Sequence, residues 1–250
     1  MSIEWRVDVV GQAGSTQDIA HNKVMAGEEE GYVIQALQQT AGRGRHGNKW
    51  EAPMGNLYMS AVLRPDCSIN DSGQIAFVVA VALSETLSDY LKPQHKKTLK
   101  WPNDVYIDGL KLSGILLENN LAANGSIDSL VMGIGVNIFK APELAISLQD
   151  VTTKPVYVNV FRDEFLQHFS KIYADWQEKG FAAIGQAWLK EAHGLNEPMT
   201  VRLPDQSWQG IFKGIDERGA LIVTLDNGEE KIIRAGDVHF GSNNETEAAN

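Results

Sequence analysis

The chain has a single cysteine and no long apolar run, and these two absences exclude several classes of protein. Cys67 alone cannot form an intramolecular disulfide or supply a multi-cysteine metal site. No apolar stretch is long enough to span a bilayer. The first ten residues carry charges where a signal peptide would be apolar. We therefore predict a cytoplasmic protein that does not enter a membrane.

Positive charge is also scarce. The 250 residues include 22 Lys and Arg against 32 Asp and Glu, and the formal net charge is −10. Broad nucleic-acid binding needs a basic face that displaces counterions, so we predict no nucleic-acid partner. Arg43 and Arg45 form a small cationic cluster on this acidic chain. Such a cluster indicates a compact anionic ligand. With 43% hydrophobic residues, the chain has an ordinary globular composition.

Hydrophobic patterning predicts a mixed α+β domain with a largely antiparallel sheet. The pair Asp108-Gly109 between apolar runs is typical of a hairpin, so the strands around it are expected to be antiparallel. We expect strands at 3–10 (ending at Gly11), 31–37, 55–65, 98–101, 105–118 and 126–139, and helices starting at Ser15 or Thr16, within 70–91, and at about 159–179 and 181–192, with Gly180 and Gly194 as stops.

The pattern changes at Pro198, after which short apolar segments are separated by turn sequences. These segments, at 199–203, 207–215, 220–225 and 230–235, predict a small β-barrel. The chain is thus expected to divide into a main domain, a barrel and a disordered polar tail, over residues 1–195, 196–241 and 242–250.

The segment 42–47 reads GRGRHG and matches the dinucleotide-binding pattern G-x-G-x-x-G. That fingerprint needs a helix starting inside it, whereas Pro53 and Gly55 block a helix here and a strand follows. Patterns for a P-loop or a protein kinase are also absent from the sequence. What remains is a flexible cationic loop that either closes over an anionic ligand or stays a solvated surface loop.

A second polar group lies on the expected hairpin. The segment KWPND, residues 100–104, ends one strand, and Lys111 lies on the returning strand. A lysine in an apolar strand needs a partner, and the hairpin would bring Asp104 close to Lys111. This pair is either part of a site or a structural ion pair. GIGVN, residues 133–137, adds two glycines and an asparagine at a strand end.

Together these motifs closely resemble those of the biotin protein ligases. The matching segments are GSTQD, QQTAGRGRHGNKW, GNLYMS, KWPNDVY, KLSGILLE and GIGVN, in the family's order across residues 11–140. The resemblance implies a catalytic domain of class II synthetase type, followed by an SH3-like barrel. It also implies a two-step reaction, in which biotin and ATP form biotinyl-5′-adenylate, and the biotinyl group then passes to a lysine of a biotin carboxyl carrier protein.

The resemblance also implies roles for individual residues. Lys111 would hold the biotin carboxylate or the anhydride oxygen, and Trp50 would stack on adenine. The implied catalytic residues are Lys111, Arg45 and Asp104. The implied biotin contacts are Ser15, Thr16 and Gln17 at the ureido end, with Gln39, Arg43, Gly44, Arg45, Lys111 and Gly114. The implied ATP or adenylate contacts are Arg45, His46, Trp50, Lys100, Asn103 and Asn137.

Mg²⁺ is implied to accompany ATP, although no metal-ligand spacing is visible in the sequence and Asp104 is only a candidate contact. A homodimer through an exposed sheet edge is compatible with the pattern. The chain has Gln17 and His46 where some members have Asn and Arg. Because a strand is expected from residue 3, we expect no N-terminal helix-turn-helix and no repressor function.

Several alternatives stay open at this point. A lipoate or octanoate protein ligase would use a related fold and the same carboxyl-adenylating chemistry. A biotin-responsive regulator would instead use the barrel to bind partners, and the barrel could also be a structural accessory. Trp50 and Trp101 could be plain core residues. Ser15 could serve only as a helix N-cap.

Overall fold

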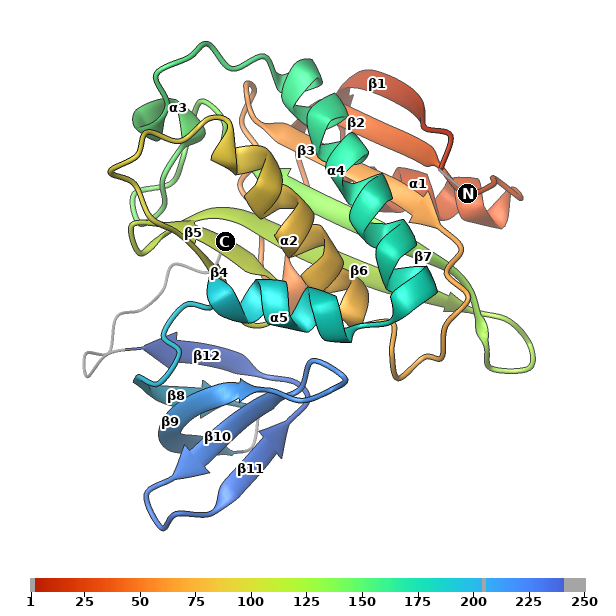
Figure 1. The fold of residues 1–250 in the computed structure, drawn as a ribbon. Helices are drawn as coiled ribbons and strands as arrows, with labels where there is room; N and C mark the ends of the chain where they lie inside the picture. Colours follow the sequence, from red (N-terminus) through yellow and green to blue (C-terminus); the bar gives the residue numbers. More distant parts are fainter. Residues whose placement is uncertain (1–2, 204–205, 241–250) are drawn as a thin grey trace.

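A computed structural model describes residues 3–203 and 206–240, and Figure 1 shows a large sheet with helices and a second, smaller sheet. The large sheet has the strand order β1-β2-β3-β7-β6-β5-β4. β1 and β2 are parallel, and every other neighbouring pair is antiparallel. Its strands are β1 Arg6–Ala13, β2 Tyr32–Gln39, β3 Leu57–Leu63, β4 Lys97–Lys100, β5 Asp104–Ile107, β6 Leu110–Leu121 and β7 Ile127–Val136.

Helices cover both faces of the large sheet. Consecutive residues of β2 point to opposite faces, so Val33 packs in the main core while Ile34 packs against α1 (Thr16–Met25). The main core lies under α2 (Gln74–Ser88), α4 (Val158–Lys179) and α5 (Ala182–Lys190), which Figure 1 shows together on one face. Nearly every residue of α2 is buried, as its apolar sequence predicts.

The Ser15 cap, the Gly180 stop and the hairpin signal are confirmed. Ser15 caps α1, and its side chain accepts a hydrogen bond from the backbone N–H of Gln17. Gly180 ends α4 with φ 75°. Asp108 and Gly109 have φ of 51° and 82°, which suits the two-residue turn between β5 and β6. The antiparallel pairing of β5 with β6 follows from that turn.

The second sheet is antiparallel, with the order β11-β10-β9-β8-β12. Its apolar side chains join those of the main domain in one continuous cluster. The α+β fold with a C-terminal β-domain is therefore confirmed. The strands are β8 Pro198–Arg202, β9 Ser207–Ile215, β10 Leu221–Leu225, β11 Glu230–Ile233 and β12 Asp237–Phe240.

Some expected boundaries were wrong, for reasons of tertiary pairing. β1 continues through Gly11 because Gln12 pairs with Gln38 of β2. α5 ends at Lys190, well before Gly194, because the residues after it pair with β4: the Leu99 N–H donates to the carbonyl of Glu191, and the His193 N–H donates to the carbonyl of Leu99. The short helix α3 (Leu148–Val151) and strand β12 were not expected at all.

Other expectations stay predictions. β1 and β4 are the outer strands of the large sheet, and pairing of two chains through such an edge is untested. The expected disordered tail, 242–250, lies outside the described residues. Within the described part, every helix is too short or too polar to cross a lipid bilayer.

Candidate active site

One cavity of about 580 Å³ brings together most of the predicted site residues. This volume is within the range of small-molecule sites. The walls come from the start of α1, the end of β2, the loop 42–50, the β5–β6 hairpin, the middle of β7, and β12 of the second sheet. Every predicted site residue lines the cavity except His46 and Asn137.

Lys111 and Asp104 form the ion pair that the hairpin was expected to create. Lys111 Nζ lies 3.0 Å from Asp104 Oδ2, and both side chains are about four-fifths buried. The two residues are not directly opposite, because an irregularity between Val105 and Tyr106 pairs Lys111 with Tyr106 and Asp104 with Gly114. The long lysine side chain spans the offset. The other carboxylate oxygen, Asp104 Oδ1, is buried without a hydrogen-bond partner.

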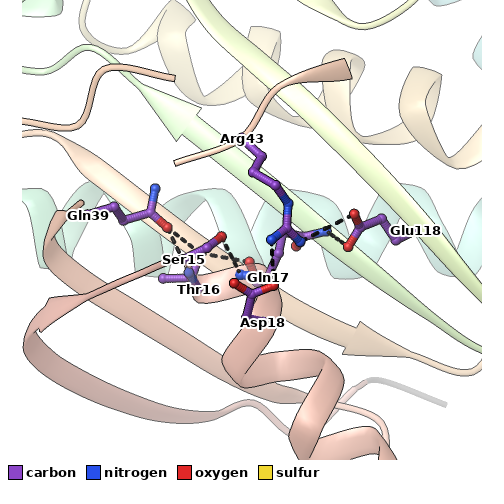
Figure 2. Close-up of polar contacts among 8 residues, drawn as sticks. Ser15, Thr16, Gln17, Asp18, Gln39, Arg43 and Glu118 are labelled. Atoms are coloured by element: carbon purple, nitrogen blue, oxygen red, sulfur yellow. Dashed lines mark hydrogen bonds and ion pairs between the residues drawn. The ribbon is translucent and has the colours of Figure 1, made fainter. Parts of the chain in front are cut away.

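The start of α1 fixes one end of the cavity, as Figure 2 shows. Gln39 Oε1 accepts hydrogen bonds from the backbone N–H of Thr16 at 2.7 Å and from its hydroxyl at 3.1 Å. Ser60 donates to the Thr16 hydroxyl oxygen at 2.8 Å. Because Gln39 Oε1 is already occupied by Thr16, its Nε2 group is the one that has donors left for a ligand.

Gln17 and Arg43 meet a shared carboxylate beside this end (Figure 2). Gln17 Nε2 donates to Glu118 Oε2 at 3.0 Å, and Arg43 Nη2 lies 3.5 Å from Glu118 Oε1. Arg43 also donates to Asp18 in the first turn of α1. That hydrogen bond to Asp18 raises the pKa of the Arg43 guanidinium above its usual value. Arg43 is therefore held as a cation at the rim of the cavity.

Arg45 points from the loop toward the hairpin and toward the second sheet. Its Nη1 donates to Asn103 Oδ1 at 3.2 Å and lies 3.8 Å from Asp237 Oδ1. Burial lowers the pKa of Arg45 from its usual value, and the carboxylates of Asp237 and Asp104 oppose that effect. His46 is exposed, has φ 55°, and lies 4.0 Å from Asp237 outside the cavity.

Two glycines and Trp50 shape the floor. A Cβ on Gly135 would lie 2.5 Å from the Trp50 ring, and one on Gly114 would lie 3.0 Å from it. Only glycine allows so close an approach of ring and strand. Trp50 is 7% exposed and packs with Ala52 and Tyr58, yet its Nε1 has no hydrogen-bond acceptor. Trp50 thus packs as a core residue and also forms a cavity wall.

The remaining predicted residues divide between the cavity and the core. Lys100 is 4% exposed, and its Nζ donates to the Tyr106 hydroxyl at 3.3 Å. Asn103 Nδ2 donates to the carbonyl of Ile115 at 2.7 Å, which holds its oxygen toward Arg45. Asn137 is buried, and its backbone N–H donates to the carbonyl of Leu112. No direct contact of Asn137 with a cavity ligand follows from this position.

Sequence reasoning missed several cavity residues. Tyr106 is the last residue of the recognised segment KWPNDVY, but it was given no role. Asp237, Val238 and His239 come from the second sheet, and no local signal places them beside the loop 42–50. Glu118, which contacts two cavity residues without lining the cavity, ends the KLSGILLE segment but reaches its partner Gln17 across 101 positions of sequence.

Unsatisfied polar atoms concentrate in this cavity. Among the described residues, Gln17 Oε1, Trp50 Nε1 and Asp104 Oδ1 are buried side-chain atoms without a hydrogen-bond partner, and all three residues line the cavity. A buried unpaired group is costly, so each is explained best by a ligand that completes it. Two acceptors and one donor await such a ligand.

Comparison with known proteins identifies the family. The family described as "Biotin/lipoate A/B protein ligase family" matches residues 12–137, and "Biotin protein ligase C terminal domain" matches residues 194–241. A biotin--[acetyl-CoA-carboxylase] ligase of Paracoccus denitrificans is 39% identical over 218 residues, which cover 83% of this chain and 90% of that protein. The chain belongs to the biotin protein ligase family.

One further relative and one solved structure are similar to this biotin protein ligase family member over most of its length. The bifunctional ligase/repressor BirA of Bacillus subtilis strain 168 is 32% identical, over 94% of this chain and 76% of its own length. A solved structure of the biotin protein ligase of Aquifex aeolicus in complex with biotin and ATP has a TM-score of 0.81 and 27% identity. It matches 94% of this chain and 99% of that chain.

Proposed function

We propose that the chain is a biotin protein ligase that adenylates biotin with ATP and transfers the biotinyl group to a lysine of a biotin carboxyl carrier protein. The observation that carries this proposal is the set of side chains that line the 580 Å³ cavity. Amide side chains suited to a urea lie at one end, and the cations Lys111, Arg43 and Arg45, suited to a carboxylate and phosphates, lie nearby. Family membership supports the same reaction.

The amides favour biotin over lipoate. Gln39 keeps amide donors for a ligand, because Thr16 occupies its oxygen, whereas Gln17 keeps an unpaired oxygen acceptor. A cyclic urea has both a carbonyl oxygen and N–H groups, and so complements both amides. The dithiolane ring of lipoate has neither, and would leave the buried oxygen of Gln17 unpaired.

The first step is an attack by a biotin carboxylate oxygen on the α-phosphorus of ATP, with pyrophosphate as the leaving group. Negative charge then builds on the phosphoryl oxygens. Lys111 Nζ, held by Asp104, and the guanidinium of Arg45, held by Asn103, supply fixed positive charge for it. The loop 42–47 covers the mixed anhydride and limits its hydrolysis by water.

The second step needs an uncharged amine. The lysine nitrogen of the acceptor attacks the biotinyl carbonyl carbon, AMP leaves, and the nitrogen loses a proton. Asp104 Oδ1, which is buried and unpartnered, is placed to accept a hydrogen bond from that amine and orient it. Asp104 thus acts in the transfer step through one oxygen while the other holds Lys111.

Mg²⁺ fits this cavity only as a companion of ATP. Among the described residues, no cluster of three His, Cys, Asp or Glu side chains is arranged to hold a metal. Mg²⁺ commonly keeps several waters and binds through one or two carboxylates plus substrate phosphates. Asp104 Oδ1 is a free carboxylate oxygen of that kind, and the bound ion would supply neutralisation of phosphate charge.

Pyrophosphate release tests the substrate assignment. The purified chain is incubated with ATP, Mg²⁺ and either biotin or lipoate, and pyrophosphate is measured. We expect release with biotin and none above background with lipoate or octanoate. Release with lipoate and not with biotin would show that the chain is the other kind of ligase.

A further inference from the structure

Glu118 is a carboxylate that no part of the proposed reaction uses, yet it contacts two elements of the cavity. Its Oε2 accepts from Gln17 Nε2 at 3.0 Å, and its Oε1 lies 3.5 Å from Arg43 Nη2 (Figure 2). The Glu118 side chain is 38% exposed, so it is open to solvent and reaches the cavity only through these partners. Its effect on a ligand must therefore be indirect.

The contact with Glu118 determines which end of the Gln17 amide is available. A carboxylate only accepts hydrogen bonds, whereas an amide side chain has a donor end and an acceptor end. Facing Glu118, Gln17 must therefore present its NH₂ group to the carboxylate. Its oxygen, Oε1, is then left without a donor beside Gly133, where an added Cβ would lie 2.7 Å away. Both Gln17 and Gly133 line the cavity.

We propose that Glu118 is a positioning residue for ligand selection, because it fixes Gln17 as a hydrogen-bond acceptor toward an N–H of the ligand. This inference rests on the proposed function and adds to it the group that discriminates the urea. A ligand with an N–H at this point completes a buried acceptor. A ligand with an oxygen there places two acceptors together, and is rejected.

The substitution Glu118→Gln tests the idea with minimal change of shape. Residue 118 then has a single oxygen, and Arg43, which can only donate, competes for it. When Arg43 takes that oxygen, the new NH₂ group faces Gln17, whose amide rotates and presents a donor to the ligand. The acceptor for the urea N–H is then lost.

The measurement is the dissociation constant, by calorimetry, of biotin and of two analogues in which one ureido N–H is replaced by ring oxygen. Wild type should bind the analogue altered at the Gln17 position about tenfold or more weakly than biotin, which is the usual cost of a buried unpaired acceptor. Glu118→Gln should lose that preference by a similar factor. Desthiobiotin, which keeps the urea, should weaken in the variant by the same factor as biotin.

Two variants serve as matched controls. Asp18→Asn removes the other carboxylate from Arg43 and leaves the Gln17–Glu118 contact in place, so it should keep the wild-type preference. Glu85→Gln removes a charge of a remote pair with His168 and should behave as wild type. Thermal unfolding of each variant checks that the fold is kept.

The outcomes separate the possible errors. If Glu118→Gln keeps the wild-type preference for biotin over the carbamate analogues, Glu118 does not set the polarity of Gln17. If Asp18→Asn loses the preference equally, the preference depends on Arg43 and not on the direct contact between Glu118 and Gln17, and the inference is wrong. If wild type binds no biotin at all, the proposed function itself has failed.

Discussion

Lys111 is the residue on which the first chemical step depends most. Its ammonium group lies in the cavity, 3.0 Å from Asp104 and 5.6 Å above the centre of the Trp50 ring. A mostly buried cation paired with one carboxylate oxygen keeps further donors for an anion. The sequence left open a merely structural Asp–Lys pair, and the structure adds to it a cavity and an unpaired Asp104 oxygen.

Replacing Lys111 by alanine should therefore abolish adenylation with little loss of fold. Loss of one fixed charge that stabilises a developing anion costs on the order of 10²–10³-fold in rate. The measurement is biotin-dependent pyrophosphate release, with circular dichroism to check folding. Lys179→Ala, a change in an exposed pair with Asp175 on α4, is the control and should retain full activity. A folded Lys111→Ala protein with normal turnover would show that the key cation lies elsewhere.

Cys67 should be an unreactive thiol at neutral pH. Burial raises the pKa of Cys67 to about 11, and the nearby carboxylates of Asp71 and Asp66 add to the effect. The thiolate is the reactive form, so alkylation should be slow at pH 8 and accelerate as the pH rises toward 11. Labelling rates with iodoacetamide in native buffer and in denaturant provide the test. Equal rates in the two conditions at pH 8 would contradict the assignment.

At the scale of elements, the loop 42–50 contacts four parts of the fold. Arg43 contacts α1 and β6. Arg45 contacts the turn between β4 and β5, through Asn103, and strand β12, through Asp237. These contacts hold the loop over the edge of the cavity. When a ligand with phosphate oxygens binds, Arg45 would exchange its contacts with Asn103 and Asp237 for stronger contacts with the phosphate.

Arg45→Ala should therefore make the adenylate leak. The expected result is release of biotinyl-adenylate from the enzyme about tenfold faster than from wild type, since hydrogen bonds to a charged group stabilise more than neutral ones. The measurement is the dissociation rate of pre-formed labelled adenylate. Lys49→Ala removes another cation of the same loop that does not line the cavity, and should leave the rate unchanged. Unchanged retention by Arg45→Ala would mean that Arg45 is only a solvated charge.

Local signals predicted elements well and pairings across the chain poorly. The Asp108-Gly109 turn, the Ser15 cap and the Gly180 stop were correct because each depends on a few adjacent residues. The short strand β12 was missed because it forms by pairing with β8, 35 positions away at Asp237 and Arg202. Likewise, the contact between Gln17 and Glu118 depends on the neighbouring placement of α1 and β6, which no spacing in the sequence reveals.

At the scale of the whole molecule, the second sheet is docked on the main domain and takes part in the site. The Trp101 indole N–H donates to the carbonyl of Gly219 at 2.9 Å, and Gln74 donates to the carbonyl of Glu217. Trp101 packs in the core, as the open alternative had it, and it also lines the cavity. Residues 196–241 were predicted to form a barrel. The contact of Asp237 in this region with Arg45 of the loop 42–50 was not foreseen.

Gly219→Ala should loosen this docking. Gly219 has φ +81°, and a Cβ there would lie 2.6 Å from the Phe77 ring. Gly228→Ala is a matched control, because Gly228 has φ +83° and open space around it. Each variant bears roughly 1–2 kcal/mol of backbone strain, and only Gly219→Ala adds the clash. We expect a larger fall in Tm for Gly219→Ala by calorimetry, whereas equal falls would show that the Phe77 contact does not matter.

In the proposed reaction, the cavity activates biotin and passes it to a protein lysine. The most direct measurement combines the purified chain with ATP, Mg²⁺, radiolabelled biotin and a biotin carboxyl carrier domain, and counts the label on the carrier. We predict ATP-dependent labelling that is lost when the carrier's target lysine is changed to arginine. Absence of label on the carrier, with both proteins folded, would contradict the proposed reaction.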